Sequence, residues 1–105
     1  MVRIIWTERA VRNLKHIFDY IAVDSNIYAS QFTKSIVKAS EKLKYFPFMG
    51  RVVPEFADEQ LREVLFQNYR IVYRIAGDAK IVEVIAVVHA SRDLLLLARG
   101  DWELQ

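Results

Sequence analysis

Alternating hydrophobic and polar positions dominate the stretch from Leu61 to His89, and they predict three consecutive β-strands. The predicted strands are Leu61–Phe66, Tyr69–Ile75 and Lys80–Val88. The linkers between them carry turn residues, Asn68 in the first and Gly77 with Asp78 in the second. Ile81–Val88 is apolar on both faces apart from Glu83, which is typical of an interior strand. We therefore predict an antiparallel meander with Ile81–Val88 in the interior of the sheet.

The predicted strand Tyr69–Ile75 has two different faces, because side chains alternate along a strand. One face carries only large apolar and aromatic side chains, namely Tyr69, Ile71, Tyr73 and Ile75. The other face carries Arg70, Val72 and Arg74. The first face suits a hydrophobic core, and we expect the second to present its two guanidinium groups.

Helical spacing dominates the first half of the chain. Apolar residues recur at intervals of three and four, which predicts one helix from Glu8 to about Val23 and another from about Ile27 to Tyr45. Thr7 and the segment 24–26 supply capping residues. The connection is short, so we expect an antiparallel helix hairpin.

The remaining segments are shorter. Val2–Trp6 is rich in branched and aromatic residues, which predicts a strand beside Ile81–Val88. Residues 47–60 show no period and are expected to form a loop, where functional residues are more frequent than average. Ser91 is a capping residue for a last helix over 92–99, and its four adjacent leucines exceed what one core face can bury.

Together these elements predict an α+β fold in which the helix hairpin packs on one face of the sheet. A chain of 105 residues, 53% of them hydrophobic, is expected to form one domain over residues 1–105. The chain has no cysteine, which excludes disulfides and thiolate chemistry. No metal-ligand spacing or Gly-rich phosphate loop occurs, so we expect no metal and no cofactor. No apolar run or leader pattern suggests a membrane or secretion, and we expect a cytoplasmic protein.

Positive charge in the second half comes almost entirely from arginine, at Arg51, Arg62, Arg70, Arg74, Arg92 and Arg99. Guanidinium groups suit phosphate and carboxylate partners. Glu55 and Glu63, if they converge with these arginines, would supply the carboxylate base and the cations that RNA cleavage by a 2′-hydroxyl requires. His89, at a strand end, is either an acid–base group or a structural histidine. Glu and Arg residues on neighbouring antiparallel strands are, however, more often cross-strand ion pairs that only stabilise the sheet, and we favour this structural role for Arg62 and Glu63.

Several short sequence motifs occur along the chain, and in their order and spacing the chain resembles the RelE/ParE superfamily of toxins. The motifs are Tyr20-Ile21-Ala22, Phe46-Pro47-x-x-Gly50-Arg51, Val53-Pro54-Glu55, Arg62-Glu63, Tyr69-Arg70-Ile71-Val72-Tyr73-Arg74 and His89-x-x-Arg92. These toxins belong to type II toxin–antitoxin systems and are sometimes called plasmid stabilisation proteins. The resemblance covers about Val2 to Leu95.

The resemblance implies a growth-inhibiting toxin neutralised by a co-expressed antitoxin. One branch of the superfamily, RelE-like, cleaves messenger RNA on the ribosome; the other, ParE-like, inhibits DNA gyrase. The motifs around Gly50 and His89 are more similar to those of the ParE branch, so we favour DNA gyrase as the target. A toxin-like domain that has lost activity and is retained to bind the antitoxin is a third reading.

The resemblance also implies roles for individual residues. In YoeB-like nucleases a Glu, an Arg and a terminal His are catalytic, and Glu55, Arg70 and His89 match those positions, although sixteen residues follow His89 here. Contacts with the target or with phosphate are expected from Arg51, Arg62, Arg74, Arg92 and Arg99. Contacts with the antitoxin are expected from Leu94, Leu95, Leu96, Leu97 and Trp102.

Overall fold

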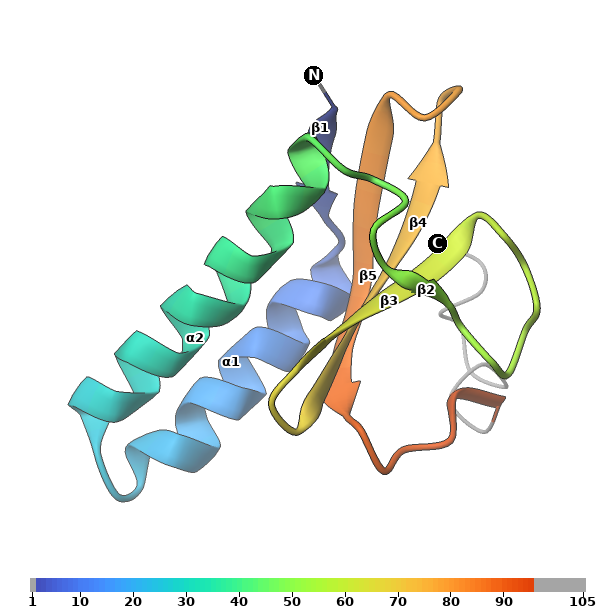
Figure 1. The fold of residues 1–105 in the computed structure, drawn as a ribbon. Coiled ribbons are helices and arrows are strands. Elements are labelled where there is room, and N and C mark those ends of the chain that lie inside the picture. The colour runs from blue at the N-terminus through green and yellow to red at the C-terminus, as the bar shows by residue number, and fades with distance from the viewer. Residues whose placement is uncertain (1, 96–105) are drawn as a thin grey trace.

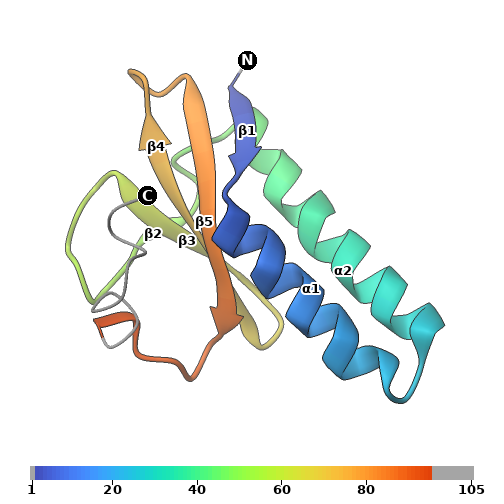
Figure 2. The same cartoon turned by 180° about the vertical axis from the view of Figure 1, so that it is seen from behind.

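The computed structural model describes residues 2–95 of the chain. Within them, five strands form one sheet and two helices lie side by side against one of its faces (Figure 1; Figure 2). The elements are, in chain order, β1 (Arg3–Trp6), α1 (Glu8–Ala22), α2 (Asn26–Glu41), the 3₁₀ helix η1 (Lys42–Lys44), β2 (Arg51–Val52), β3 (Leu61–Phe66), β4 (Tyr69–Ala76) and β5 (Ile81–His89). The predicted α+β class and its helix hairpin are confirmed.

Both helices begin where the sequence supplies a capping oxygen. Thr7 Oγ1 accepts a hydrogen bond from the Ala10 amide at 3.2 Å, and Ser25 Oγ accepts one from the Tyr28 amide at 3.0 Å. The apolar stripes of the helices meet the sheet in a buried cluster of Ala10, Ile17, Ile36, Ile71, Val84 and Val87. The predicted periodicity of three and four therefore identified the side of each helix that faces the core.

The strand order is β1-β5-β4-β3-β2, so β5 lies in the interior of the sheet as predicted. It pairs antiparallel with β4 and parallel with β1, which joins it over Ile81 to Val84. A β-bulge interrupts the pairing with β4, because Val72 faces Ala86 while Tyr73 faces Val84. Ile85 is the extra residue, and it packs in the same buried cluster as Ala86.

The sheet face opposite the helices is also buried, which corrects the expectation of an arginine-presenting face. Part of the 47–60 segment and the segment after β5 cover it, and they form a cluster of Val53, Leu61, Val72, Ile85, Ala86 and Leu94. Arg70 is consequently buried at 5% exposure, and Arg74 is half-buried. A strand with one apolar and one basic face can still have both faces covered when the charges find partners.

Two further expectations are corrected at the ends of the core. Part of the segment 47–60 forms the two-residue strand β2, which pairs Arg51 with Glu63 and is too short to show any period in the sequence. The helix expected over 92–99 does not begin at Arg92, because helical backbone starts only at Leu94. Positions 96–99 lie outside the described residues. Neither helix of the described chain is long and apolar enough to cross a membrane.

Candidate functional site

The centre of the candidate site is Arg70, whose guanidinium is buried against the sheet face opposite the helices. Its Nη2 and Nη1 donate to the two carboxylate oxygens of Glu55 at 2.7 and 2.8 Å. Its Nε donates to Oε1 of Glu63 at 2.6 Å. The Arg70 side chain is 6% exposed and that of Glu63 is 0% exposed. Such two-point, charge-assisted hydrogen bonds hold a guanidinium in one orientation.

Glu63 links Arg70 to a second arginine. Arg51 Nε donates to Oε2 of Glu63 at 2.5 Å, although the Arg51 side chain itself is 57% exposed. The four side chains come from three different segments: the 47–60 connection supplies Arg51 and Glu55, β3 supplies Glu63, and β4 supplies Arg70. Glu55 and Glu63 converge with Arg51 and Arg70, but Arg62 is not among the arginines that contact them. Neighbouring residues of a strand point to opposite faces, so Arg62 and Glu63 cannot share a partner site.

Electrostatics fix the protonation of this network. Hydrogen bonds from Arg70 lower the pKa of Glu55 to about 2, against the opposing effect of burial, and the Leu94 amide lowers it further. The same contact with Glu55 raises the pKa of Arg70 above its ordinary value, again against the effect of burial. Glu55 is therefore a carboxylate at every physiological pH.

The network also fixes the chain that leaves the sheet after β5. The Leu94 amide donates to Oε2 of Glu55 at 3.1 Å, and Arg70 Nη1 donates to the Arg92 carbonyl at 3.0 Å. Both oxygens of Glu55 are thus occupied by protein donors. The pair Glu55–Arg70 holds the 92–94 segment in place.

His89 lies at the end of β5 and its side chain has local partners. The Ser91 amide donates to Nδ1 at 3.2 Å, and the Ser91 hydroxyl lies 2.8 Å from the same nitrogen. Because an amide can only donate, Nδ1 is an acceptor, which places the proton of the neutral ring on Nε2. The ring also packs edge-on against Tyr69 at a centroid distance of 5.7 Å. No hydrogen bond joins His89 to Glu55 or Arg70 in the described chain.

The other predicted contact arginines are distributed over several surfaces. Arg62 donates to the carbonyls of Glu59 and Gly50 at 2.9 Å each and stacks over the Phe48 ring at 5.0 Å. Arg74 is half-buried, and its Cα faces that of Glu83 across β4 and β5. Arg99 lies outside the described residues. These arginines therefore do not form one common site with Arg70.

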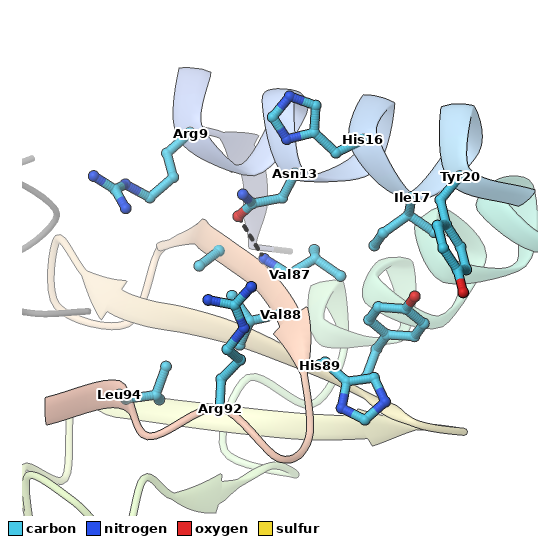
Figure 3. Close-up of a pocket in the computed structure, with 12 residues that line it drawn as sticks. Arg9, Asn13, His16, Ile17, Tyr20, Val87, Val88, His89, Arg92 and Leu94 are labelled. Carbon is cyan, nitrogen blue, oxygen red and sulfur yellow. Dashed lines mark hydrogen bonds between the residues drawn. The ribbon is translucent and has the colours of Figure 1, made fainter. Parts of the chain in front are cut away.

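Arg92 lines a cleft at the edge of the sheet (Figure 3). The cleft lies beyond Val84, the last residue of β5 that pairs with β1. The cleft has a volume of about 300 Å³ and lies between α1, the end of β5 and the 90–94 segment. The Asn13 side chain accepts a hydrogen bond from the Val87 amide at 3.0 Å, which satisfies the open strand edge. Arg92 extends into this space from below, and no carboxylate pairs with its guanidinium in the described chain. No Asp or Glu is among the described residues that line the cleft.

The predicted antitoxin contacts are only partly placed. Leu94 is buried at 1% exposure inside the second core cluster, whereas Leu95 is 49% exposed. Leu96, Leu97 and Trp102 lie outside the described residues. Of the predicted contact leucines, the structure places Leu94 and Leu95, and Leu95 is the one available to a partner.

Two further residues shape this region, and their partners cannot be identified from the sequence. Tyr73 is fully buried, and its hydroxyl donates to the Pro47 carbonyl at 2.7 Å and accepts from the Gly50 amide at 3.0 Å. It thereby anchors the start of the loop that carries Arg51 and Glu55. Asn13 lies among the polar positions of the first helix, and nothing in the sequence connects it with Val87. A buried tyrosine at an apolar strand position could be identified, but its partner 23 residues away could not.

The contacts of Glu55 limit what this carboxylate can do as a catalytic base. A general base requires a carboxylate or imidazole within reach of the substrate and a pKa near the working pH. Glu55 fulfils neither condition, since its oxygens are occupied and its pKa is about 2. Within residues 2–95, no three acidic or histidine side chains come together as a metal site.

Comparison with known families gives a match over most of the chain. The family model described as ParE toxin of type II toxin-antitoxin system, parDE, matches residues 4–94. Toxin RelE2 of Caulobacter vibrioides is 32% identical over 93 residues, which is 88% of this chain and 99% of that protein. Putative toxin Y4kP of Sinorhizobium fredii is 36% identical over 90 residues, which is 84% of this chain and 88% of that protein.

Solved structures show the same fold. A chain of the chromosomal ParDE TA system from P. aeruginosa superposes with a TM-score of 0.72 and covers 87% of this chain. The match spans 98% of that chain, and the two sequences are 19% identical. The arrangement of a helix hairpin on a mixed sheet is therefore an established one.

Proposed function

This chain belongs to the ParE toxin family of type II toxin–antitoxin systems, and we propose that it inhibits growth by binding DNA gyrase rather than by cleaving RNA. The observation that carries this proposal is the closed ion pair of Arg70 with Glu55. An endonuclease would need these two side chains as phosphate ligand and base. Here each is committed to the other and to the chain that follows β5. Both side chains are therefore occupied within the fold, and we expect the target to bind the exposed surface instead.

The cleft at the edge of β5 is the surface that best fits a target contact. Arg92 offers a guanidinium without a carboxylate partner in the described chain, beside aromatic and basic side chains on α1. Arginine is a frequent anchor at protein interfaces, because it combines charge, planarity and several donors. Gyrase binding therefore depends on Arg92 more than on His89, whose imidazole is engaged with Ser91 and Tyr69.

The cognate antitoxin is the expected protein partner. We propose that one of its segments crosses apolar surface of the helix hairpin and of the segment that begins at Leu94. Large apolar side chains are exposed in both places, with Val23 at 83%, Ile27 at 74% and Leu95 at 49%. Exposure of this kind on a small protein is typical of an interaction surface.

The test compares three variants on induced expression and with purified gyrase. His89→Gln keeps the size and polarity of the side chain, and we expect growth inhibition and gyrase-dependent DNA cleavage to persist. Arg92→Gln should weaken both at least tenfold. Arg12→Gln, which removes an exposed arginine of α1 outside the cleft, is the matched control and should behave like the unaltered chain.

Two results would contradict the proposal. Ribosome-dependent cleavage of messenger RNA that is lost in His89→Gln would make the chain an endonuclease. Absence of any growth inhibition, with antitoxin binding intact, would identify an inactive toxin-like domain.

A further inference from the structure

A row of lysines follows one flank of the second helix, and neither the fold nor the proposed gyrase contact uses it. Lys34, Lys38 and Lys42 are spaced by four residues, and all three are exposed. Residues four apart lie above one another on a helix, so the row extends over roughly 12 Å. In the described chain Glu41 pairs with Lys44 at 3.9 Å, whereas none of the three has an ion-pair partner.

An apolar trough lies beside the lysine row. It consists of two hollows of about 430 and 350 Å³, and both are lined by Lys38, Lys42 and Met49. The first hollow lies at the end of α2, where its further lining residues are Glu41, Lys44, Tyr45 and Phe46. The second lies between α2 and β3, where its further lining residues are Ser35, Ala39, Val64, Leu65 and Phe66.

The trough is built from large apolar side chains that the fold leaves in contact with water. Tyr45 is 65% exposed, Phe46 66%, Leu65 53% and Met49 50%. Isolated exposed hydrophobics are ordinary, but four that line adjoining hollows form a continuous patch. Such a patch on a small protein is typical of a docking surface.

We propose that this trough binds an amphipathic, acidic segment of a protein partner, with its apolar side chains in the two hollows and its carboxylates along the lysine row. Charge complementarity selects the partner, because the two hollows are lined by three lysines, Lys38, Lys42 and Lys44, and by one glutamate, Glu41. A helix with apolar residues at intervals of three and four and acidic residues on one flank matches both features. The inference rests on the proposed function, since a toxin of this family is expected to have an antitoxin to supply the segment.

The chemistry of the floor favours a protein over a nucleic acid. Single-stranded nucleic acids are held by aromatic rings that stack on successive bases and by cations along the backbone. Tyr45 and Phe46 line the first hollow and Phe66 lines the second, whereas the other apolar lining residues are Met49, which both hollows share, and Ala39, Val64 and Leu65 of the second. Aliphatic and thioether side chains suit apolar side chains of a peptide.

The test measures the affinity of the full chain for the purified product of the adjoining reading frame. The double variant Lys38→Glu/Lys42→Glu should bind at least tenfold more weakly and should reduce the dependence of affinity on salt. Leu65→Ser/Met49→Ser should weaken binding at least tenfold without changing the salt dependence. Arg12→Glu/Lys80→Glu makes the same charge change outside the trough and should alter affinity less than twofold. Thermal unfolding of every variant checks that the fold is intact.

Each alternative result has a distinct meaning. If the unaltered chain binds and the trough variants bind equally well, the trough is not the docking surface and the proposed function stands. If the unaltered chain does not bind that product, and the product does not relieve growth inhibition, the proposed function fails together with this inference. If a 20-nucleotide single-stranded RNA binds and the lysine variant abolishes that binding while protein affinity is unchanged, the trough is a nucleic-acid surface instead.

Discussion

Arg70 and Glu55 form a two-point ion pair, Nη2 to Oε1 at 2.7 Å and Nη1 to Oε2 at 2.8 Å, that joins an interior strand to a loop. The pair is nearly enclosed, with 6% exposure for Arg70 and 17% for Glu55. A buried ion pair is weak support for stability in itself, but removing one partner leaves the other charge buried and unpaired. This asymmetry makes the role of the pair testable.

Removing the central arginine should therefore destabilise the fold. Arg70→Ala leaves Glu55 and the fully buried Glu63 without their main partner, and we expect a loss of about 3–5 kcal/mol in the free energy of unfolding. Arg51→Ala removes a largely exposed partner of the same Glu63, so its loss should stay near 1 kcal/mol, as for surface ion pairs. Urea unfolding monitored by circular dichroism compares the two. Equal losses would mean that Arg70 does not hold the network.

Acid should weaken the fold through Glu55. Its pKa is about 2 in the folded chain and near 4.5 when unfolded, so its stabilising contribution is complete above about pH 4.5. That contribution is lost as the pH falls from about 4.5 to 2, and it amounts to at most about 3 kcal/mol.

The measurement is the free energy of unfolding of the chain and of Glu55→Gln at several pH values. Glu55→Gln cannot titrate, so the difference between the two should shrink over that same pH interval. A constant difference would show that Glu55 does not titrate with a lowered pKa.

Adjacent leucines should differ sharply in their effect on stability. Leu94 is buried with Val53, Val72 and Ile85, so Leu94→Ala should cost about 2–5 kcal/mol through lost burial and a cavity. Leu95 is half exposed, and Leu95→Ala should cost less than about 1 kcal/mol. Thermal unfolding separates the two variants. A larger loss of stability in Leu95→Ala than in Leu94→Ala would show that Leu95, and not Leu94, is the buried leucine.

Gly50 should not accept a side chain. A Cβ at this position would lie 2.6 Å from the Glu63 carbonyl oxygen and 2.6 Å from the Tyr73 hydroxyl. Gly50→Ala should therefore cost about 1–3 kcal/mol by overpacking.

Tyr73→Phe provides the matched comparison, because it removes one of the two close contacts together with the hydrogen bonds to Pro47 and Gly50. The free energy of unfolding lost in the double variant should be smaller than the sum of the losses of the two single variants, because the hydroxyl that the new Cβ would meet is absent. Strict additivity in a double-mutant cycle would show that the alanine does not meet Tyr73.

Periodic patterns of apolar residues in the sequence determined the main helices and strands. The period of two in Tyr69–Ile75, the apolar run Ile81–Val88 and the helical spacing after Thr7 each identified an element, and the structure contains all of them. These signals are readable because each one is generated by neighbours within a few residues. The order and spacing of the short sequence motifs then identified the family, because proteins that share a fold keep such motifs at similar distances along the chain.

Tertiary structure decided which charges and leucines are buried. Arg70 looked exposed because the residues that neutralise it, Glu55 and Glu63, are 15 and 7 positions away and lie on other segments. Leu94 and Leu95 are the same residue type, yet the fold buries the Leu94 side chain at 1% exposure and leaves that of Leu95 at 49%. The amide of Leu94 donates to the carboxylate of Glu55, 39 positions away, which holds this leucine against the sheet. Residues that pair from distant segments produce no periodic pattern in the sequence. The burial of a polar group depends on those partners and not on its own position, so it became visible only with the folded structure.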